Sequence, residues 1–352
     1  IVYSGGAVDS VSSYQLYTTS DGMPSNNITH LAYDNKKARL LIASDAGIAI
    51  WSRKKKIDVE LVWDNSFPAQ SIKPKGVAAD GVSRLYFKVK RGNDTMPAIK
   101  KVEVSLKDYD AAFATLRGKL KKADTLLLNQ YTTEASTATS SETSRTDSTK
   151  KGEFWFWYVS TEDFSISSTS PYASLTERKD SVKIKVTYSN DTKDSVYLDV
   201  RVVRPPLVLV HGLASSPAAW DPFKNAAGTA FVNNDLYKYR HAMQMDGRAA
   251  FIDNAKKLVA GDIALGEGTA RLSTLQGNIE EMRAMGFAAN QVYYVCHSMG
   301  GIMARSVIRW YADKFYANGG YKYNNYGKGF IHKLITINTP HNGAVPGDLI
   351  GE

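Results

Sequence analysis

One stretch of the sequence, Val295 to Gly301 (VCHSMGG), constrains the fold more than any other. The run that leads into it, Gln291 to Cys296 (QVYYVC), is short and apolar, which predicts a buried strand. The run that follows, Gly300 to Tyr316, has apolar residues at four-residue steps, which predicts an amphipathic helix. Those apolar residues are Met303, Val307, Tyr311 and Phe315. Ser298 is therefore expected at a sharp strand-to-helix turn.

A serine at such a turn has a distinctive chemical environment. The first N–H groups of a helix have no partner within the helix, and the positive end of the helix dipole lies beside them. A hydroxyl that projects from the sheet at this point lies next to donors that can stabilise negative charge. Gly300 and Gly301 leave room for the strand and the helix to approach each other closely.

These residues resemble the nucleophile elbow of the α/β-hydrolase superfamily, in its lipase and esterase form. The family usually has Gly or Ala where this chain has Cys296. A second segment, Pro206 to Gly212 (PLVLVHG), resembles the His-Gly segment after the third core strand of such lipases. A third, Phe330 to Asn338 (FIHKLITIN), predicts another core strand and runs into Thr339 to Gly343 (TPHNG), a motif common in lipases. The resemblance covers about residues 204–352 and keeps the family order.

The resemblance implies a role for several residues. Ser298 is the implied catalytic nucleophile, and the backbone N–H groups of Leu213 and Met299 are the implied oxyanion hole. The residues implied to line the site are His211, Gly212 and His297. The implied activity is that of a serine hydrolase that cleaves carboxylic esters or lipids through an acyl-enzyme, with no cofactor and no metal. An acyltransferase or an amidase would use the same elbow.

The acid and the base of a catalytic triad are harder to assign. In this family Ser is followed along the chain by Asp or Glu and then by His. After Ser298 the histidines are His332, within a predicted strand, and His341, within the TPHNG motif, and neither matches the family's catalytic histidine. Asp348 follows the sixth strand, where a minority of relatives place the acid. We expect the sequence to be a piece of a longer protein, cut at both ends, with the acid and the base beyond Glu352.

The first part of the chain is rich in predicted β-structure. Residues 21–51 hold two short β runs around Asp34 to Lys37 and a third run after Gly47, and Lys75 to Lys90 is a weaker echo. The pattern resembles the propeller repeat of bacterial two-component-regulator proteins. A closed propeller needs at least four blades and does not fit the length, so an unrelated β-meander remains the alternative. Asp108 to Leu128 predicts a helix.

The segment before the hydrolase-like region predicts a β-hairpin. Ser181 to Tyr188 and Ser195 to Val203 alternate in polarity around a short turn. This hairpin is either the end of an immunoglobulin-like sandwich or the first two strands of the hydrolase.

The predicted fold class is multidomain, with N-terminal all-β modules followed by an α/β-hydrolase whose sheet is mostly parallel and doubly wound, truncated at the C-terminus. Residues 1–128 form the propeller-like region with a helix, and 129–152 form a Ser/Thr-rich linker or loop. Residues 153–203 form the small β module, and 204–352 form the partial hydrolase core.

Composition limits which binding partners and which cellular compartment are expected for this chain. The net charge of +9 comes from dispersed basic residues without a nucleic-acid motif, so we expect no nucleic-acid partner. The single cysteine, Cys296, excludes an intrachain disulfide and a zinc site built from cysteines. The sequence has no run of about 18 apolar residues, so we expect no transmembrane segment.

We expect an extracellular, periplasmic or cell-surface location in a bacterium, with the N-terminal β modules binding a polymer or a surface ligand. The rival prediction is a recognition protein whose hydrolase domain is inactive.

Overall fold

The structure is a computed structural model, and it describes most of the chain in separate ranges. The described residues are 2–3, 14–15, 19, 24–34, 39–52, 56–64, 71–93, 96–107, 116–122, 137–141, 152–165, 175–225, 240–243, 251–260, 274–310 and 328–343. The chain divides into two compact units. The first holds Ile1–Lys56 and Gly92–Asp94, and the second holds Ile57–Arg91 and Thr95–Glu352.

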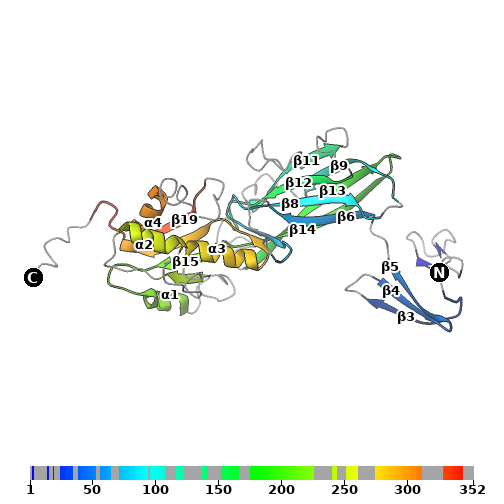
Figure 1. Cartoon of the computed structure of the whole chain (residues 1–352), viewed down its shortest axis with the longest axis horizontal. Coiled ribbons are helices and arrows are strands. Elements are labelled where there is room, and N and C mark those ends of the chain that lie inside the picture. The colour runs from blue at the N-terminus through cyan, green and yellow to red at the C-terminus, as the bar shows by residue number, and fades with distance from the viewer. Residues whose placement is uncertain are drawn as a thin grey trace, which may run out of the picture. The chain divides into compact units, whose positions relative to one another are not determined.

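Most of the described residues of the first unit lie in β-strands. A three-stranded antiparallel sheet has the order β3 (Ile28–Asp34), β4 (Arg39–Ser44) and β5 (Gly47–Ser52). The short strands β1 (Val2–Tyr3) and β2 (Tyr14–Gln15) pair with each other. The β3–β5 sheet occupies the stretch in which the sequence predicts three β runs (Figure 1).

The second unit contains a β-sandwich. Its four-stranded sheet has the order β10-β12-β8-β6, and its six-stranded sheet has the order β11-β9-β13-β14-β7-β17. The strands are β6 (Ile57–Trp63), β7 (Gly76–Ala78), β8 (Arg84–Arg91), β9 (Ile99–Leu106), β10 (Lys119–Lys122), β11 (Thr137–Ser141), β12 (Phe154–Val159), β13 (Glu177–Tyr188), β14 (Lys193–Val203) and β17 (Phe287–Ala288). Neighbouring strands are antiparallel, except that β7 is parallel to both β14 and β17.

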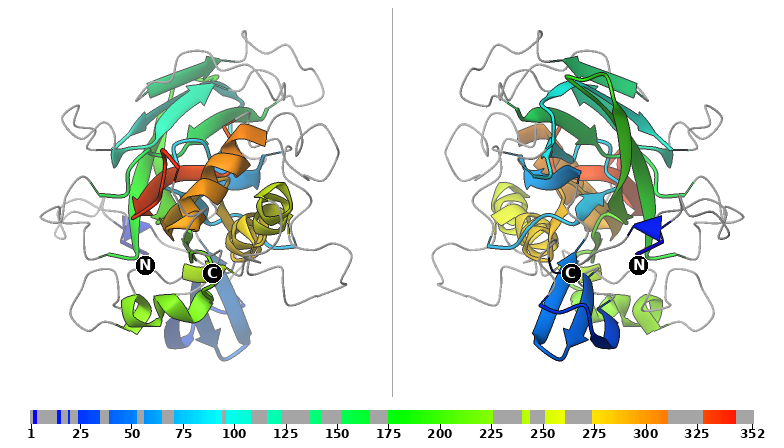
Figure 2. Two further views of the ribbon diagram at one scale, coloured as in Figure 1. Left: turned by 90° about the vertical axis from the view of Figure 1, so that its left-hand side faces the viewer. Right: turned by 90° about the vertical axis from the view of Figure 1, so that its right-hand side faces the viewer.

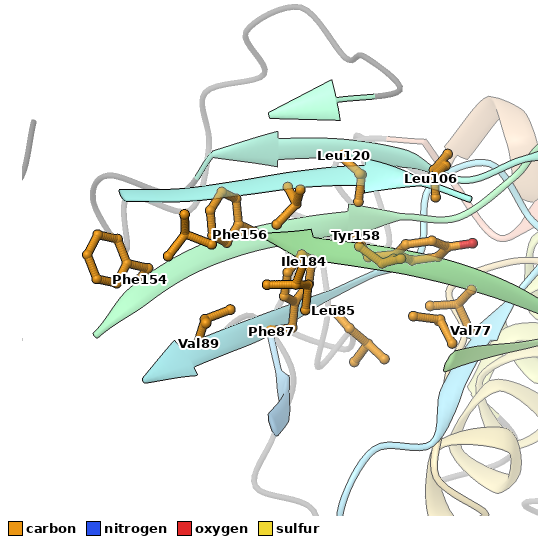
Figure 3. Close-up of a cluster of buried hydrophobic side chains, with 14 of the residues drawn as sticks. Val77, Leu85, Phe87, Val89, Leu106, Leu120, Phe154, Phe156, Tyr158 and Ile184 are labelled. Carbon is orange, nitrogen blue, oxygen red and sulfur yellow. The ribbon is translucent and has the colours of Figure 1, made fainter. Parts of the chain in front are cut away.

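The core between these two sheets follows from the alternation of side chains along each strand. Phe154, Phe156 and Tyr158 of β12 all point into it, and the ring of Phe156 stacks on that of Phe87 with centroids 5.3 Å apart (Figure 3). The facing sheet contributes Ile184 and its neighbours. The predicted hairpin is the long pair β13 and β14, and its turn includes Asp191 at φ 62°.

Two segments of this sandwich differ from the sequence predictions. Lys119–Lys122 forms strand β10 instead of part of a helix, because Leu120 is buried in the core while the lysines on either side of it alternate outward. Thr137–Ser141, which we placed in a linker, forms strand β11 and pairs with β9. Strand pairing uses backbone groups, so it does not require apolar side chains.

The remaining sheet is parallel and has the order β16-β15-β18-β19. Its strands are β15 (Leu207–Val210), β16 (Arg240–Met243), β18 (Val292–His297) and β19 (Ile331–Ile337). The helical elements are the 3-10 helix η6 (Pro217–Trp220), α1 (Asp221–Asn225), α2 (Phe251–Ala260), α3 (Leu275–Ala284) and α4 (Met299–Trp310).

The two faces of the parallel sheet bury different partners. Val208 and Val210 of β15 pack in one cluster with the helices α2, α3 and α4, which lie side by side (Figures 1 and 2). Leu207 and Leu209 point to the other face and pack in a second cluster with Trp220 at the end of η6. The apolar residues Leu275, Ile279 and Met282 of α3 are fully buried in the first cluster.

The predicted fold class is wrong. The described residues lie mostly in β-strands of antiparallel or mixed sheets with few helices, and no doubly wound parallel α/β-hydrolase fold is evident. The parallel sheet has four strands, and β17, which precedes the elbow strand, pairs instead with β7 of the sandwich. The physical reason is that three short motifs specify strand-to-helix turns, but they do not specify which strands pair beside them.

None of the helices in the described ranges is long and apolar enough to cross a membrane.

Candidate active site

Ser298 lies where the sequence predicts it. Strand β18 ends at His297 and helix α4 begins at Met299, so Ser298 is the single residue between them. Its φ of 51° is in the left-handed region, which costs energy for a residue with a side chain. Its backbone N–H donates to the carbonyl oxygen of Ile337 at 2.9 Å, which ties the turn to the end of β19.

Two glycines permit the close approach of backbone to this turn. A Cβ on Gly212 would lie 2.8 Å from the Cβ of Ser298 and 3.3 Å from its Oγ. A Cβ on Gly300 would lie 2.8 Å from the carbonyl oxygen of Val210, so the first turn of α4 can rest on the end of β15 only without a side chain there. The His-Gly segment and the elbow, 86 residues apart by number from Gly212 to Ser298, are thus in direct contact.

Backbone strain is concentrated at one edge of the parallel sheet. Among the described residues, the non-glycine residues with positive φ are Asp191, Ala214, Ser298 and Asn338. Ala214 follows β15, Ser298 follows β18 and Asn338 follows β19, so three of the four lie at the carboxyl ends of parallel strands. This is the edge at which parallel sheets bind ligands, and strained backbone there supports a functional site.

A cavity of about 470 Å³ opens beside Ser298. Its lining residues are His211, Gly212, Leu213, Ser215, Ala219, Trp220, Pro222, Phe223, His297, Ser298 and Ile337. One wall is aromatic, since the rings of Trp220 and Phe223 meet edge to face with centroids 5.8 Å apart. The lining residues that the structure describes include no Asp, Glu, Lys or Arg, so this part of the cavity suits an uncharged and partly apolar ligand.

Trp220 and Phe223 were not identified from the sequence. They follow the His-Gly segment in the run SSPAAWDPF, in which Pro217 stands at the start of η6. A proline at the first turn of a helix is a start signal that could have placed this short helical segment over the sheet.

The four histidines of the His-Gly, elbow, β19 and TPHNG segments occupy different environments. His211 is buried, and its Nδ1 donates to the carbonyl oxygen of Gly212 at 2.8 Å, which fixes the loop that carries Leu213. His297 is exposed and lines the cavity. The Nε2 of His332 donates to the carbonyl oxygen of Glu162 at 2.8 Å, and the Nε2 of His341 is 3.1 Å from the Oγ1 of Thr336.

Neither His332 nor His341 therefore faces Ser298. His332 is the second residue of β19, at the opposite edge of the sheet from the elbow. The partner of His341, Thr336, is in register with Cys296, whose side chain packs on the helical face, away from the cavity. Asp348, the candidate acid, lies outside the described residues.

Cys296 is a packed thiol below the elbow. It is fully buried, and its Sγ lies 3.4 Å from the carbonyl oxygen of Ile335, to which the thiol donates. Burial raises the pKa of this thiol to about 12, so it stays protonated near neutral pH. A protonated thiol is a poor nucleophile.

Comparisons with known proteins agree with the chemistry of the elbow. A family model described as "Putative serine esterase (DUF676)" matches residues 206–347, which is less than half of the chain. No curated protein matches the chain.

Among solved structures, a conjugative transposon lipoprotein from Bacteroides eggerthii is 10% identical, with a TM-score of 0.19, over 41% of this chain and 96% of that chain. A variant of BcpA, the major pilin subunit of Bacillus cereus, is 13% identical, with a TM-score of 0.24, over 53% of this chain and 64% of that chain. TM-scores this low carry no argument about fold or function. The family match is what supports a serine esterase-like or lipase-like domain at residues 206–347.

Proposed function

We propose that the protein is a serine hydrolase that cleaves carboxylic esters, with Ser298 as the nucleophile. The observation that carries the proposal is the strained turn at Ser298, held at the carboxyl edge of a parallel sheet and open to an uncharged cavity. The Oγ of Ser298 attacks the acyl carbon, the alcohol leaves with a proton, and water then releases the acid from the acyl-enzyme.

The proposed oxyanion hole consists of the backbone N–H groups of Leu213 and Met299. Met299 is the first residue of α4, where N–H groups lack partners within the helix and the dipole is positive. Leu213 follows Gly212, where an added Cβ would lie 2.8 Å from the Cβ of Ser298, so we place its amide close to the same point. Two donors aimed at a developing oxyanion typically contribute about 10²–10³-fold each to the rate.

The proton of Ser298 requires an acceptor that the described residues do not place. His332 and His341 are bound elsewhere, so the proposed general base and its acid lie outside the described ranges. Asp348 remains a proposed acid of the triad.

An acyltransferase or amidase would use the same nucleophile and oxyanion donors, and the acceptor of the acyl group distinguishes these activities.

Covalent labelling with a fluorophosphonate probe tests the nucleophile directly. We expect one labelled serine in the protein and no label in Ser298→Ala. Ser215→Ala is the matched control, because Ser215 lines the same cavity, and this variant should still be labelled. Label that persists in Ser298→Ala and disappears in Ser215→Ala would place the nucleophile elsewhere.

A second proposed role belongs to the first unit. Its three-stranded sheet leaves large apolar side chains exposed on both faces, with Leu31 at 61% on one face and Ile48 at 70% on the other. Exposed apolar sheet faces support binding to a polymer or a surface. We propose that this surface lies outside the cytoplasm of a bacterium. If fluorophosphonate labelling fails, recognition by this unit with an inactive hydrolase domain becomes the better proposal.

A further inference from the structure

His297 is a polar side chain in the cavity to which the proposed catalysis gives no role. The lining residues are mostly apolar, and the two imidazoles among them differ in their bonding. His211 is buried and is bonded to the backbone of Gly212, whereas His297 is exposed and has no hydrogen-bond partner among the described residues. Polar groups placed singly in apolar cavities orient ligands and determine which ligand fits.

The strand geometry sets the direction of the His297 side chain. His297 is in register with Ile337, and both line the cavity, while the preceding Cys296 packs on the helical face. The Nδ1 of His297 and the Oγ of Ser298 lie equally close to Gly212, since a Cβ there would be 3.3 Å from each. A ligand held at Ser298 therefore brings its neighbouring atoms within reach of the imidazole.

We propose that His297 is a specificity-determining residue that hydrogen-bonds a hydroxyl group of the substrate. The proposal rests on the proposed ester hydrolysis and names its substrate class, a neutral partial ester of a polyol. An imidazole both donates and accepts, and so does a hydroxyl, so the pair is complementary in either tautomer. The apolar part of the ester packs on Trp220 and Phe223.

Charge and burial favour a hydroxyl over an anionic group. Among the described lining residues there is no Lys or Arg, so a carboxylate or phosphate on the substrate would lose its water without a fixed counter-charge from this part of the cavity wall. A plain alkyl ester would instead remove water from the imidazole and return no hydrogen bond. Because His297 is exposed, the expected discrimination is about tenfold, smaller than for a fully buried donor.

The test compares two esters that differ only in hydroxyl groups, glyceryl monobutanoate and propyl butanoate. We expect kcat/KM to favour the glyceryl ester about tenfold in the native protein. His297→Phe keeps a ring but removes both nitrogens, so the ratio should fall to about one. His297→Asn and His297→Gln each place an amide group near one of the two ring nitrogens that are removed. One of these variants should recover part of the preference in kcat/KM for the glyceryl ester. His30→Phe, which removes an exposed imidazole from β3, is the matched control and should keep the full ratio.

A binding measurement separates this inference from the proposed catalysis. Glyceryl monobutyl ether and butyl propyl ether cannot be hydrolysed, so calorimetric titration measures the same preference without turnover. Failed labelling of Ser298 with a preserved preference for the glyceryl ether would refute the hydrolase and retain the His297 contact. Equal affinity for the two ethers in the native protein, or a preference that survives in His297→Phe, would overturn the role of His297.

Discussion

Replacement of Asp80 by alanine is expected to destabilise the second unit more than most single changes. Asp80 follows β7 of the sandwich and is 1% exposed. Its carboxylate accepts hydrogen bonds both from the sandwich and from the two residues that precede the elbow strand β18. The donors are Val82 N (3.1 Å), Ser83 N (2.7 Å), Ser83 Oγ (2.6 Å), Ser160 Oγ (3.3 Å), Asn290 N (2.9 Å) and Gln291 N (3.2 Å).

The expected loss in the free energy of unfolding follows from the hydrogen-bond donors that have no acceptor once Asp80 is replaced by alanine. Ser83 and Asn290 are buried, so water reaches their N–H groups poorly after the change. A buried donor without a partner costs about 1–3 kcal/mol, and two such donors with a partial loss at the others give about 3–5 kcal/mol. Asp80→Asn keeps one acceptor oxygen, so its expected cost is roughly half of that.

Urea unfolding followed by intrinsic fluorescence measures this loss through the midpoint and the slope. Asp58→Ala is the control, because Asp58 is partly exposed and an ion pair such as that with Lys90, at 3.6 Å, contributes about 0.2–1 kcal/mol. A loss below about 1 kcal/mol in Asp80→Ala would show that water replaces the carboxylate, and the reasoning would be refuted.

Two further predictions concern the site itself. Gly212→Ala places a methyl group 2.8 Å from the Cβ of Ser298, so the nucleophile must shift and fluorophosphonate labelling should slow about 10²-fold. Gly329→Ala is the control, because its Cβ would meet no described atom within 4 Å, and it should label at the native rate despite its strained φ; equal rates in both variants would contradict the close approach. Burial raises the pKa of the Cys296 thiol to about 12, so this thiol should resist iodoacetamide at pH 8 in the folded protein and react fully in urea. Rapid alkylation of the folded protein would show that the thiol is exposed.

The elbow was predictable because its local signals agree with one another. The strand predicted at Gln291 to Cys296 is β18, shifted by one residue, and the predicted helix begins within one residue of Met299. Apolar periodicity and paired glycines both act over a few residues, so the sequence specifies this turn without its surroundings. The predicted strand at Phe330 to Asn338 is β19 for the same reason.

The pairing of distant strands was not predictable in this way. Phe287 and Ala288 look like an ordinary approach to the elbow strand, yet they pair with Gly76 and Val77, about 210 residues earlier in the chain. Backbone hydrogen bonds hold this pairing, and they leave no residue-type signal. Lys119–Lys122 and Thr137–Ser141 were missed because the first lies in a sequence of high helix propensity and the second has no apolar residue larger than alanine.

The pairing of β17 with β7 also limits which segments of the protein can be exchanged by genetic recombination. A recombination joint at residue 204 would separate β17 from its sheet neighbour and Asn290 from the carboxylate of Asp80. The esterase-like part would then contain an unpaired strand edge at β17 and a backbone N–H at Asn290 without its acceptor. Gene shuffling that transfers this part to another protein would have to carry the sandwich with it, so the two should share one evolutionary history.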